Sequence, residues 1–100
     1  MSSNINNEGY KNGKREGLWE SHYRSGQLHT KGHYRKGKRE GEWEFYYRNG
    51  QLEYKGYYKN GVQDGIFQFY YSKGQLDRNR SGTYKNGKKL NLRISDSGEK

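Results

Sequence analysis

Three histidines are the residues of this chain best suited to metal chemistry. Pairing across the hairpins described below predicts that His22 faces His29 and that Glu44 lies beside them, so this group could hold a metal ion. These side chains would lie on an open polar face, with no groups to orient the imidazole rings. We therefore expect a solvated row of side chains here, and we interpret His33 opposite Glu40 as a cross-strand pair.

Catalytic groups have little support in the sequence. The acidic residues recur with the spacing of a repeat and form no isolated carboxylate pair. Ser21, Ser25 and Ser72 have no base placed beside them, and the glycines belong to turns instead of a phosphate-binding loop. The absence of cysteine excludes a thiolate nucleophile, a disulfide and a zinc ribbon. We expect a protein that is not an enzyme, with no cofactor and no metal.

A phrase that returns along the chain organises these residues. Tyr10-Lys11-Asn12-Gly13 returns as Tyr34-Arg35-Lys36-Gly37, as Tyr58-Lys59-Asn60-Gly61 and as Tyr84-Lys85-Asn86-Gly87. The first three copies begin 24 residues apart, and the last copy begins two residues later than that spacing requires. Repeats of this length indicate one supersecondary unit stacked on itself, an architecture that usually presents a binding surface.

Turn signals divide each repeat into hairpins. A residue followed by glycine favours a two-residue type I′ turn, which needs positive φ at both central positions. Such pairs stand at Asn12-Gly13, Ser25-Gly26, Lys36-Gly37, Asn49-Gly50, Asn60-Gly61, Lys73-Gly74 and Asn86-Gly87. We therefore predict an all-β fold: an elongated, twisted single antiparallel meander sheet of about eight strands, built from 24-residue hairpin repeats.

Pairing across these turns places the large rings on one face of the sheet. The turn at Asn49-Gly50 is predicted to set Tyr47 opposite Leu52, and the turn at Lys36-Gly37 to set Thr30 opposite Trp43. One predicted row across the strands reads Trp19, Gly32, Trp43, Gly56 and Phe67. Because each ring can lie over the bare backbone of a glycine, we expect one aromatic face and one polar face.

These residues resemble the bacterial variant of the MORN (membrane occupation and recognition nexus) repeat. The shared phrase is Tyr-x-Asn-Gly-Lys-x-x-Gly-x-Trp-x-x-Tyr-Tyr-x-Asn-Gly-Gln-Leu, and the resemblance covers residues 9–90. It implies an elongated, twisted sheet of stacked hairpins, similar to chains described as antitoxins of toxin–antitoxin pairs. The resemblance further implies a protein-binding and dimerising scaffold, with phospholipid binding proposed for some members. The chain departs from the pattern at its C-terminal end, where Asn91 and Arg93 replace the glycine and the aromatic residue.

Lysine and arginine gather at alternate turns, which lie on the same edge of a meander. This predicted basic edge could follow the phosphates of a nucleic acid or an anionic lipid surface. The alternative is that its charges keep the edge soluble and block pairing with other chains. Glu16, Glu40 and Asp64 lie beside the turns and dilute the positive field. The basic edge consists of Lys14, Arg15, Arg35, Lys36, Lys38, Arg39, Lys85, Lys88 and Lys89, with Lys11 and Lys59 beside them.

The aromatic face is the second candidate binding surface. Tyrosine and tryptophan dominate protein-binding hot spots, and aromatic platforms also stack with the bases of single-stranded nucleic acids. The competing interpretation is that most of these rings pack on glycines and on one another. The candidate protein-binding residues are Trp19, Trp43, Tyr47, Tyr54, Phe67 and Tyr71.

Composition sets the remaining expectations. The chain has 100 residues and a formal net charge of +9, which points to acidic partners. We expect one repeat domain over residues 8–94, with disordered tails at 1–7 and 95–100 outside the repeat. We also expect a cytoplasmic protein, because the sequence has neither a signal-peptide pattern nor a long apolar run.

Together these features predict a small non-enzymatic protein-binding module that neutralises or inhibits a partner, like an antitoxin or a phage or host inhibitor. The aromatic face would supply the anchors, and the basic edge would steer encounter with an acidic partner protein, a toxin or another target. One alternative is nucleic-acid or anionic phospholipid binding through the basic edge. A second alternative is a self-assembling unit, such as a homodimer, whose faces or edges pair between copies.

Overall fold

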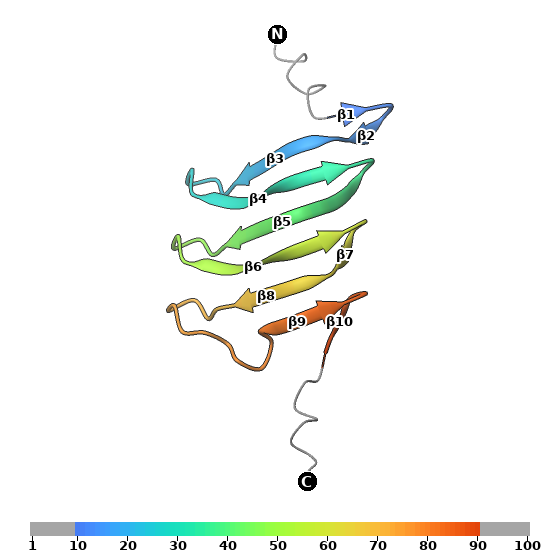
Figure 1. Cartoon of the computed structure of the whole chain (residues 1–100). Coiled ribbons are helices and arrows are strands. Elements are labelled where there is room, and N and C mark those ends of the chain that lie inside the picture. The colour runs from blue at the N-terminus through green and yellow to red at the C-terminus, as the bar shows by residue number, and fades with distance from the viewer. Residues whose placement is uncertain (1–9, 91–100) are drawn as a thin grey trace.

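The computed structural model describes residues 10–90, and these form strands and turns without a helix. Figure 1 shows the strands following one another through the sheet in chain order. The strands are β1 (Tyr10–Lys11), β2 (Lys14–Arg15), β3 (Gly17–His22), β4 (Leu28–Arg35), β5 (Lys38–Tyr46), β6 (Leu52–Lys59), β7 (Val62–Gln63), β8 (Gly65–Phe69), β9 (Gly82–Lys85) and β10 (Lys88–Lys89).

The ten segments of the described residues occupy eight strand positions. β2 continues into β3 after Glu16, and β7 continues into β8 after Asp64. The pairing order is β10-β9-β8-β6-β5-β4-β3, with β7 also on β6 and β1 paired with β2. This order confirms the predicted all-β antiparallel meander of about eight strands. The outermost residues of the predicted domain, and both expected tails, lie outside the described residues.

Four of the seven turns have the predicted conformation. Asn12, Lys36, Asn60 and Asn86 have φ between 51° and 54°, and each is followed by a glycine with positive φ, as a type I′ turn requires. At the other three turns only the glycine has positive φ. At Asn49-Gly50, for example, the Gly50 N–H donates to the Tyr47 carbonyl and the Tyr47 N–H to the Gln51 carbonyl. These turns are three-residue loops, so the two-residue prediction was wrong for them.

The three-residue loops shift the pairing beside them. Tyr46, and not Tyr47, lies opposite Leu52. A separate irregularity between Lys31 and His33 sets Thr30 opposite Phe45, so the predicted pairing of Thr30 with Trp43 was also wrong. Each bulge compensates for the change in pairing that a three-residue loop causes, so the rows of the aromatic face are preserved. Trp19 pairs with Gly32, and Trp43 pairs with Gly56.

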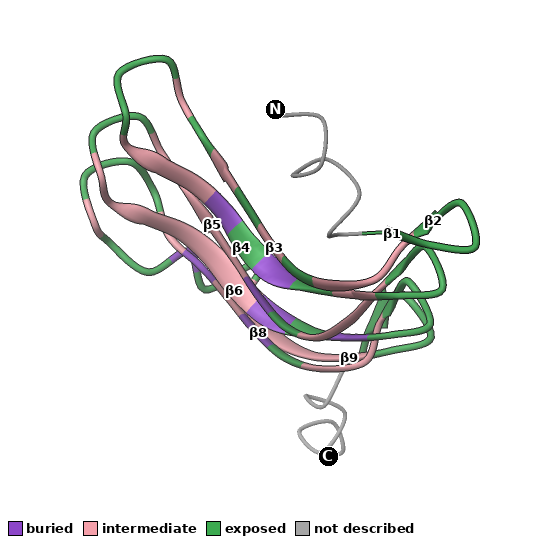
Figure 2. Cartoon of the chain, turned by 90° about the horizontal axis from the view of Figure 1, so that it is seen from above, coloured by how far each residue is buried: buried purple, intermediate pink, exposed green. Residues whose placement is uncertain are grey.

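The core lies on one face of a single layer. Trp43 and Phe67 are 1% and 0% exposed, and the rings of Trp19, Tyr34, Phe45, Tyr54, Tyr58, Phe69 and Tyr84 pack around them. Figure 2 shows the sheet bent across its middle into a trough. Since the described residues provide no second layer, rings this deeply buried lie on the inside of the bend.

Arginine side chains cover the rings where a second layer would normally lie. The Arg39 guanidinium is 5.0 Å from the ring centroids of Trp43 and Phe45. Arg15 lies 4.4 Å from the Trp19 ring, and Arg80 lies 4.7 Å from the Phe69 ring. A guanidinium stacks on an aromatic face while keeping its charge near water, so these contacts seal the inner face.

Asp77 organises the longer loop between β8 and β9. Its carboxylate is nearly buried, and Oδ1 accepts hydrogen bonds from the N–H groups of Asn79 (3.1 Å) and Arg80 (3.2 Å). Oδ2 accepts a 2.7 Å hydrogen bond from Arg80 Nε. This side-chain bond, more than any other interaction, lowers the pKa of Asp77.

The lowered pKa predicts a loss of stability in acid. Ionised Asp77 stabilises the fold fully above the ordinary carboxyl pKa of about 3.9, and the effect disappears as the pH falls through the lower folded-state value. Asp77→Asn keeps the Oδ1 acceptor but loses the ion pair. We expect the variant to be less stable than the wild type at pH 7, and the difference to shrink below about pH 4. Urea unfolding over a range of pH measures this difference, and a constant value in acid would contradict the prediction.

Candidate functional site: the basic edge

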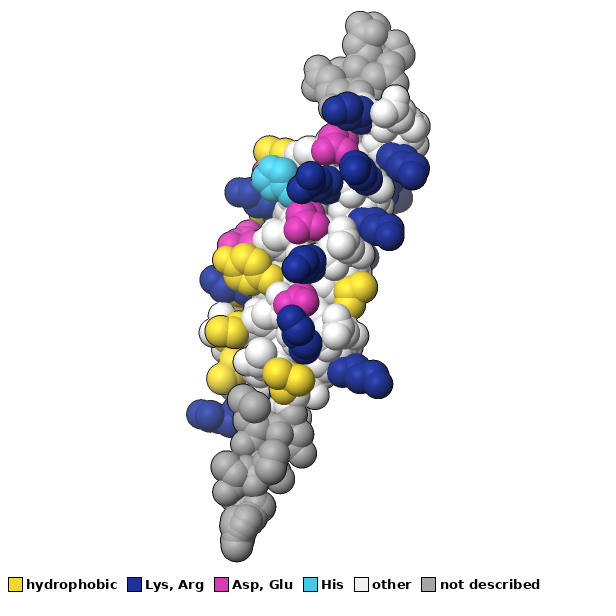
Figure 3. Space-filling view, turned by 45° about the vertical axis from the view of Figure 1, so that its right-hand side comes forward, with side chains coloured by type: hydrophobic (Ala, Val, Ile, Leu, Met, Phe, Trp, Pro, Cys, Tyr) yellow, Lys and Arg dark blue, Asp and Glu magenta, His cyan; other side chains and the backbone are white. Residues whose placement is uncertain are grey.

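The four type I′ turns stack on one another at one edge of the sheet. The Gly37 N–H donates to the Arg15 carbonyl, the Gly61 N–H to the Arg39 carbonyl and the Gly87 N–H to the Gln63 carbonyl, each at 2.9 Å. Figure 3 shows this edge, along which lysine and arginine side chains alternate with acidic ones. The hydrogen bonds fix the spacing of the turns, so the edge is a ladder with one turn per repeat.

Glutamates at the same place in two repeats hold the following turns. Glu16 Oε1 accepts a 2.9 Å hydrogen bond from the Lys36 N–H, and Glu40 Oε1 accepts a 3.1 Å bond from the Asn60 N–H. The sequence predicted only that these carboxylates dilute the positive field, and their hydrogen bonds to the turns were not predicted. The recurrence of glutamate three residues after Gly13 and after Gly37 was the available signal.

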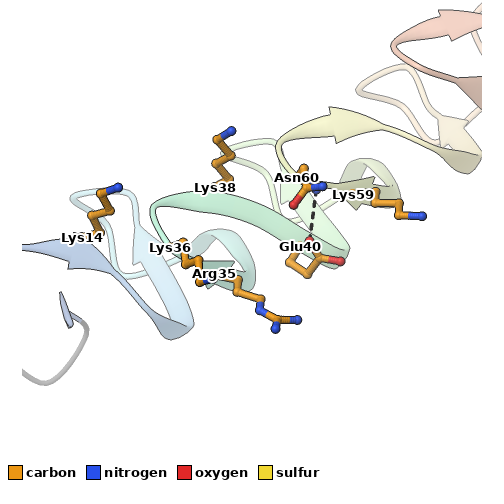
Figure 4. Close-up of a pocket in the computed structure, with 7 residues that line it drawn as sticks. All are labelled: Lys14, Arg35, Lys36, Lys38, Glu40, Lys59 and Asn60. Atoms are coloured by element: carbon orange, nitrogen blue, oxygen red, sulfur yellow. Dashed lines mark hydrogen bonds between the residues drawn. The ribbon is translucent and has the colours of Figure 1, made fainter. Parts of the chain in front are cut away.

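Two basic pockets lie between successive turns. The first has a volume of about 410 Å³ and is lined by Lys11, Asn12, Lys14, Glu16, Arg35 and Lys36. The second, drawn in Figure 4, has a volume of about 510 Å³ and is lined by Lys14, Arg35, Lys36, Lys38, Glu40, Lys59 and Asn60. Apart from Lys14, the lining of the second pocket is the lining of the first moved on by one repeat. The repeat therefore builds the same basic pocket twice.

Cations face one another directly across the hairpins of this edge. Lys11 pairs with Lys14, and Arg35 pairs with Lys38. Like charges directly opposite each other destabilise a sheet. In the third hairpin Lys59 faces the neutral Val62, whereas in the fourth Lys85 faces Lys88. Three of the four hairpins of this edge therefore hold like charges opposite each other.

Not all of the predicted basic edge lies on this surface. Neighbouring residues of a strand point to opposite faces, so Arg39, opposite Tyr34, and Lys89, opposite Tyr84, share the aromatic face. Arg15 stacks on Trp19 on that same face. The structure corrects the prediction for these three residues. Of the others, Lys14, Arg35, Lys36 and Lys38 line the pockets, and Lys85 and Lys88 flank the last turn.

The six rings predicted to bind a partner also divide. Trp43 and Phe67 belong to the core, and their burial corrects the expectation that they contact a partner. Gly32 lies against the Trp43 ring and Gly56 against the Phe67 ring, so each ring packs directly on bare backbone. Trp19, Tyr47 and Tyr54 are half-buried, and Tyr71 is 48% exposed. The inner face therefore offers a partner only part of the predicted surface.

Exposed apolar side chains lie on the other face of the sheet, which was predicted to be polar. Leu18, Tyr57 and Ile66 are 61%, 49% and 63% exposed, and each alternates with a residue of the inner face. Figure 3 shows hydrophobic side chains on the outer face beside the row of cations. The outer face was predicted from the sequence to be mostly polar, and these three exposed apolar side chains were not predicted.

The histidine group is not assembled as predicted. His22 pairs with Leu28 instead of His29, because of the three-residue loop next to it. The His29 ring packs 4.4 Å from the Tyr23 ring, whereas His33 does face Glu40, as predicted. Over residues 10–90, histidine and acidic side chains form no group of three that could hold a metal ion.

Stacked hairpins in one open layer, with basic pockets between the turns of one edge, define a β-sheet repeat protein. Comparison with known families matches residues 15–36, 39–60 and 63–86 to the MORN repeat variant, and the chain belongs to this family. A comparison with curated proteins found no match. Within the described part of the chain, no helix has the length and apolar character needed to cross a membrane.

Proposed function

We propose that this protein is a non-catalytic, cytoplasmic binding module that covers the surface of an acidic partner protein and so neutralises or inhibits it, as an antitoxin does. The observation that carries the proposal is the pair of equivalent basic pockets between successive turns of one edge. The net charge of +9 favours rapid encounter with an acidic surface.

Exposed apolar side chains of the outer face extend the same interface. Tyr57 and Ile66 lie on neighbouring strands, and β4 and β5 separate them from Leu18. Charged contacts fix the register of a complex, while exposed apolar side chains supply the area that is desolvated. The proposed interface therefore combines the basic pockets with these apolar side chains, and the half-buried rings of the inner face contribute less.

The chain itself supplies variants that test this proposal. Asn12, Asn60 and Asn86 take the place of Lys36 in the other turns, and Val62 takes the place of Lys38. We expect Lys36→Asn/Lys38→Val to fold normally and to capture at least about tenfold less of the acidic partner in a tagged pull-down from nuclease-treated lysate. Its free energy of unfolding should equal or exceed that of the wild type, because a repulsive pair is lost.

The matched control removes the same charge from the opposite edge. Ser72 takes the place of Arg24 in the third repeat, and Asn49 takes the place of Lys73 in the second. Arg24→Ser/Lys73→Asn should therefore fold and capture the partner as the wild type does. An equal loss of capture in both double variants would show that total charge, and not the basic edge, drives binding.

A phosphate-bearing ligand, either nucleic acid or anionic phospholipid, is the second candidate for the basic edge. The observation that favours it is the density of lysine and arginine around the two pockets. Binding to several phosphates falls steeply with salt concentration. Recovery that nuclease abolishes, or that collapses between low and physiological salt, would favour this candidate over a protein interface.

A further inference from the structure

We propose, resting on the function proposed above, that the two pockets form a bidentate site for two carboxylates of one acidic segment of the partner, held about one repeat apart. Each pocket brings together at least four cations and one glutamate. Lys14, Arg35 and Lys36 line both pockets, so the two anions share a central row of cations.

The sheet sets the distance between the two anions. One turn of the edge is separated from the next by two strands, and neighbouring strands lie about 4.8 Å apart, so equivalent points of the two pockets lie about 10 Å apart. The stacking hydrogen bonds from Gly37 to Arg15 and from Gly61 to Arg39 keep this spacing rigid. At physiological salt the Debye length of about 8 Å is shorter than this distance, so each anion interacts mainly with the cations next to it.

The geometry of the turns favours carboxylates over phosphates. Phosphate sites in proteins commonly use backbone N–H groups at turns or helix ends. Here the Lys36 N–H and the Asn60 N–H are already bonded to Glu16 and Glu40. Each pocket therefore offers an incoming anion side-chain cations without these two backbone donors.

The site ends at the third repeat. Lys14-Arg15-Glu16 and Lys38-Arg39-Glu40 are followed by Val62-Gln63-Asp64 at the corresponding place. Val62 removes one cation, and Asp64 lies 3.7 Å from Lys85 as an ion pair. A segment bound along the edge would therefore contact basic pockets in the first two repeats, whereas the positive charge at the corresponding place in the third repeat is partly neutralised.

Oligoproline peptides that carry two glutamates can measure this spacing. The polyproline II helix rises about 3.1 Å per residue with three residues per turn, so glutamates at positions i and i+3 lie on one side about 9 Å apart, and those at i and i+6 about 19 Å apart. The two peptides have equal charge. We expect the i,i+3 peptide to bind at least about tenfold more tightly at physiological salt, in a fluorescence-anisotropy titration.

Variants of the edge make the test specific. Lys38→Val should abolish the preference for the i,i+3 peptide, while Lys73→Asn on the opposite edge should keep it. Val62→Lys/Asp64→Glu gives the third repeat the lysine and glutamate of the first two repeats, and it should raise the affinity for the i,i+6 peptide severalfold.

Equal binding of the two peptides, or an unchanged preference in Lys38→Val, would overturn the two-carboxylate site but leave the acidic-partner function standing. A short polyphosphate that displaces the i,i+3 peptide at equal charge concentration, with higher affinity, would overturn the assignment of carboxylates. If Lys36→Asn/Lys38→Val instead captured the partner as well as the wild type, the proposed function itself would fail, whatever the peptides showed.

Discussion

Replacing Gly56 with alanine is expected to lower the free energy of unfolding by about 3 kcal/mol or more. A Cβ at this position would overlap the Phe67 ring, which lies directly against the glycine backbone. The ring cannot move away, because Tyr58 and Tyr84 pack edge-on against it with centroids at 5.4 Å and 5.1 Å. A chain of this size is stable by roughly 5–15 kcal/mol, so the substitution removes a large part of that margin.

Urea unfolding followed by tryptophan fluorescence measures the effect, and a second glycine supplies the control. Gly41 has a φ of 81°, but a Cβ added there would meet no atom within 4 Å. Gly41→Ala therefore introduces backbone strain alone, of about 1–2 kcal/mol. Gly56→Ala should be clearly the less stable of the two. If Gly41→Ala proved equally unstable, the overlap of a Cβ with the Phe67 ring would not explain the loss of stability in Gly56→Ala.

The rows of the inner face could be predicted because the rings and glycines that form them have the same spacing in each repeat. Rings and glycines recur in phase, so a register error of one residue would move every ring to the other face. The same logic identified the type I′ turns at Asn12 and Asn60, where asparagine tolerates positive φ. Both features depend on residues close together in the chain or repeated at a fixed interval.

The loops on the opposite edge could not be predicted from the same signal. Asn49-Gly50 and Asn60-Gly61 are identical dipeptides, yet the first closes a three-residue loop and the second a type I′ turn. What separates them is the strand register on both sides, which bulges adjust only once the sheet is assembled. The pairing of His22 with His29 failed for this reason, since it assumed the shorter loop.

The candidate site was predicted from the residue types and their positions in the sequence, and the face to which each side chain points was not considered. The prediction selected the cations that lie close in sequence to alternate turns, which gave Lys14, Lys36 and Lys38. It also included Arg39, although this side chain points to the face opposite that of Lys38. Successive side chains of a strand point to opposite faces. This rule was used for the middle of the sheet, and at its edge it would have placed Arg39 over the rings. The depth of Trp43 has no such signal, because alternation gives the face of a side chain and not its burial.

Trp43→Ala is the second change with a large expected effect, a loss of about 3–5 kcal/mol in the free energy of unfolding. The indole is 1% exposed, stacks with Phe45 and lies under Arg39. Its Nε1 donates a 2.9 Å hydrogen bond to the His33 carbonyl. The alanine variant would leave a cavity between β4 and β6 and a backbone carbonyl without this donor.

Two further variants separate a core role from a binding role for the rings. Trp43→Phe keeps most of the ring but loses the bond to His33, so its loss of stability should lie between those of the alanine variant and the wild type. Tyr71→Ala removes a ring that is 48% exposed and should change the unfolding free energy by less than about 0.5 kcal/mol. If Trp43→Ala instead unfolded like the wild type but lost partner capture, the indole would be a contact residue after all, and partner binding would have to open the inner face. The stacking of Arg39 on this ring argues for the opposite result, because the guanidinium closes the face from which a partner would have to approach.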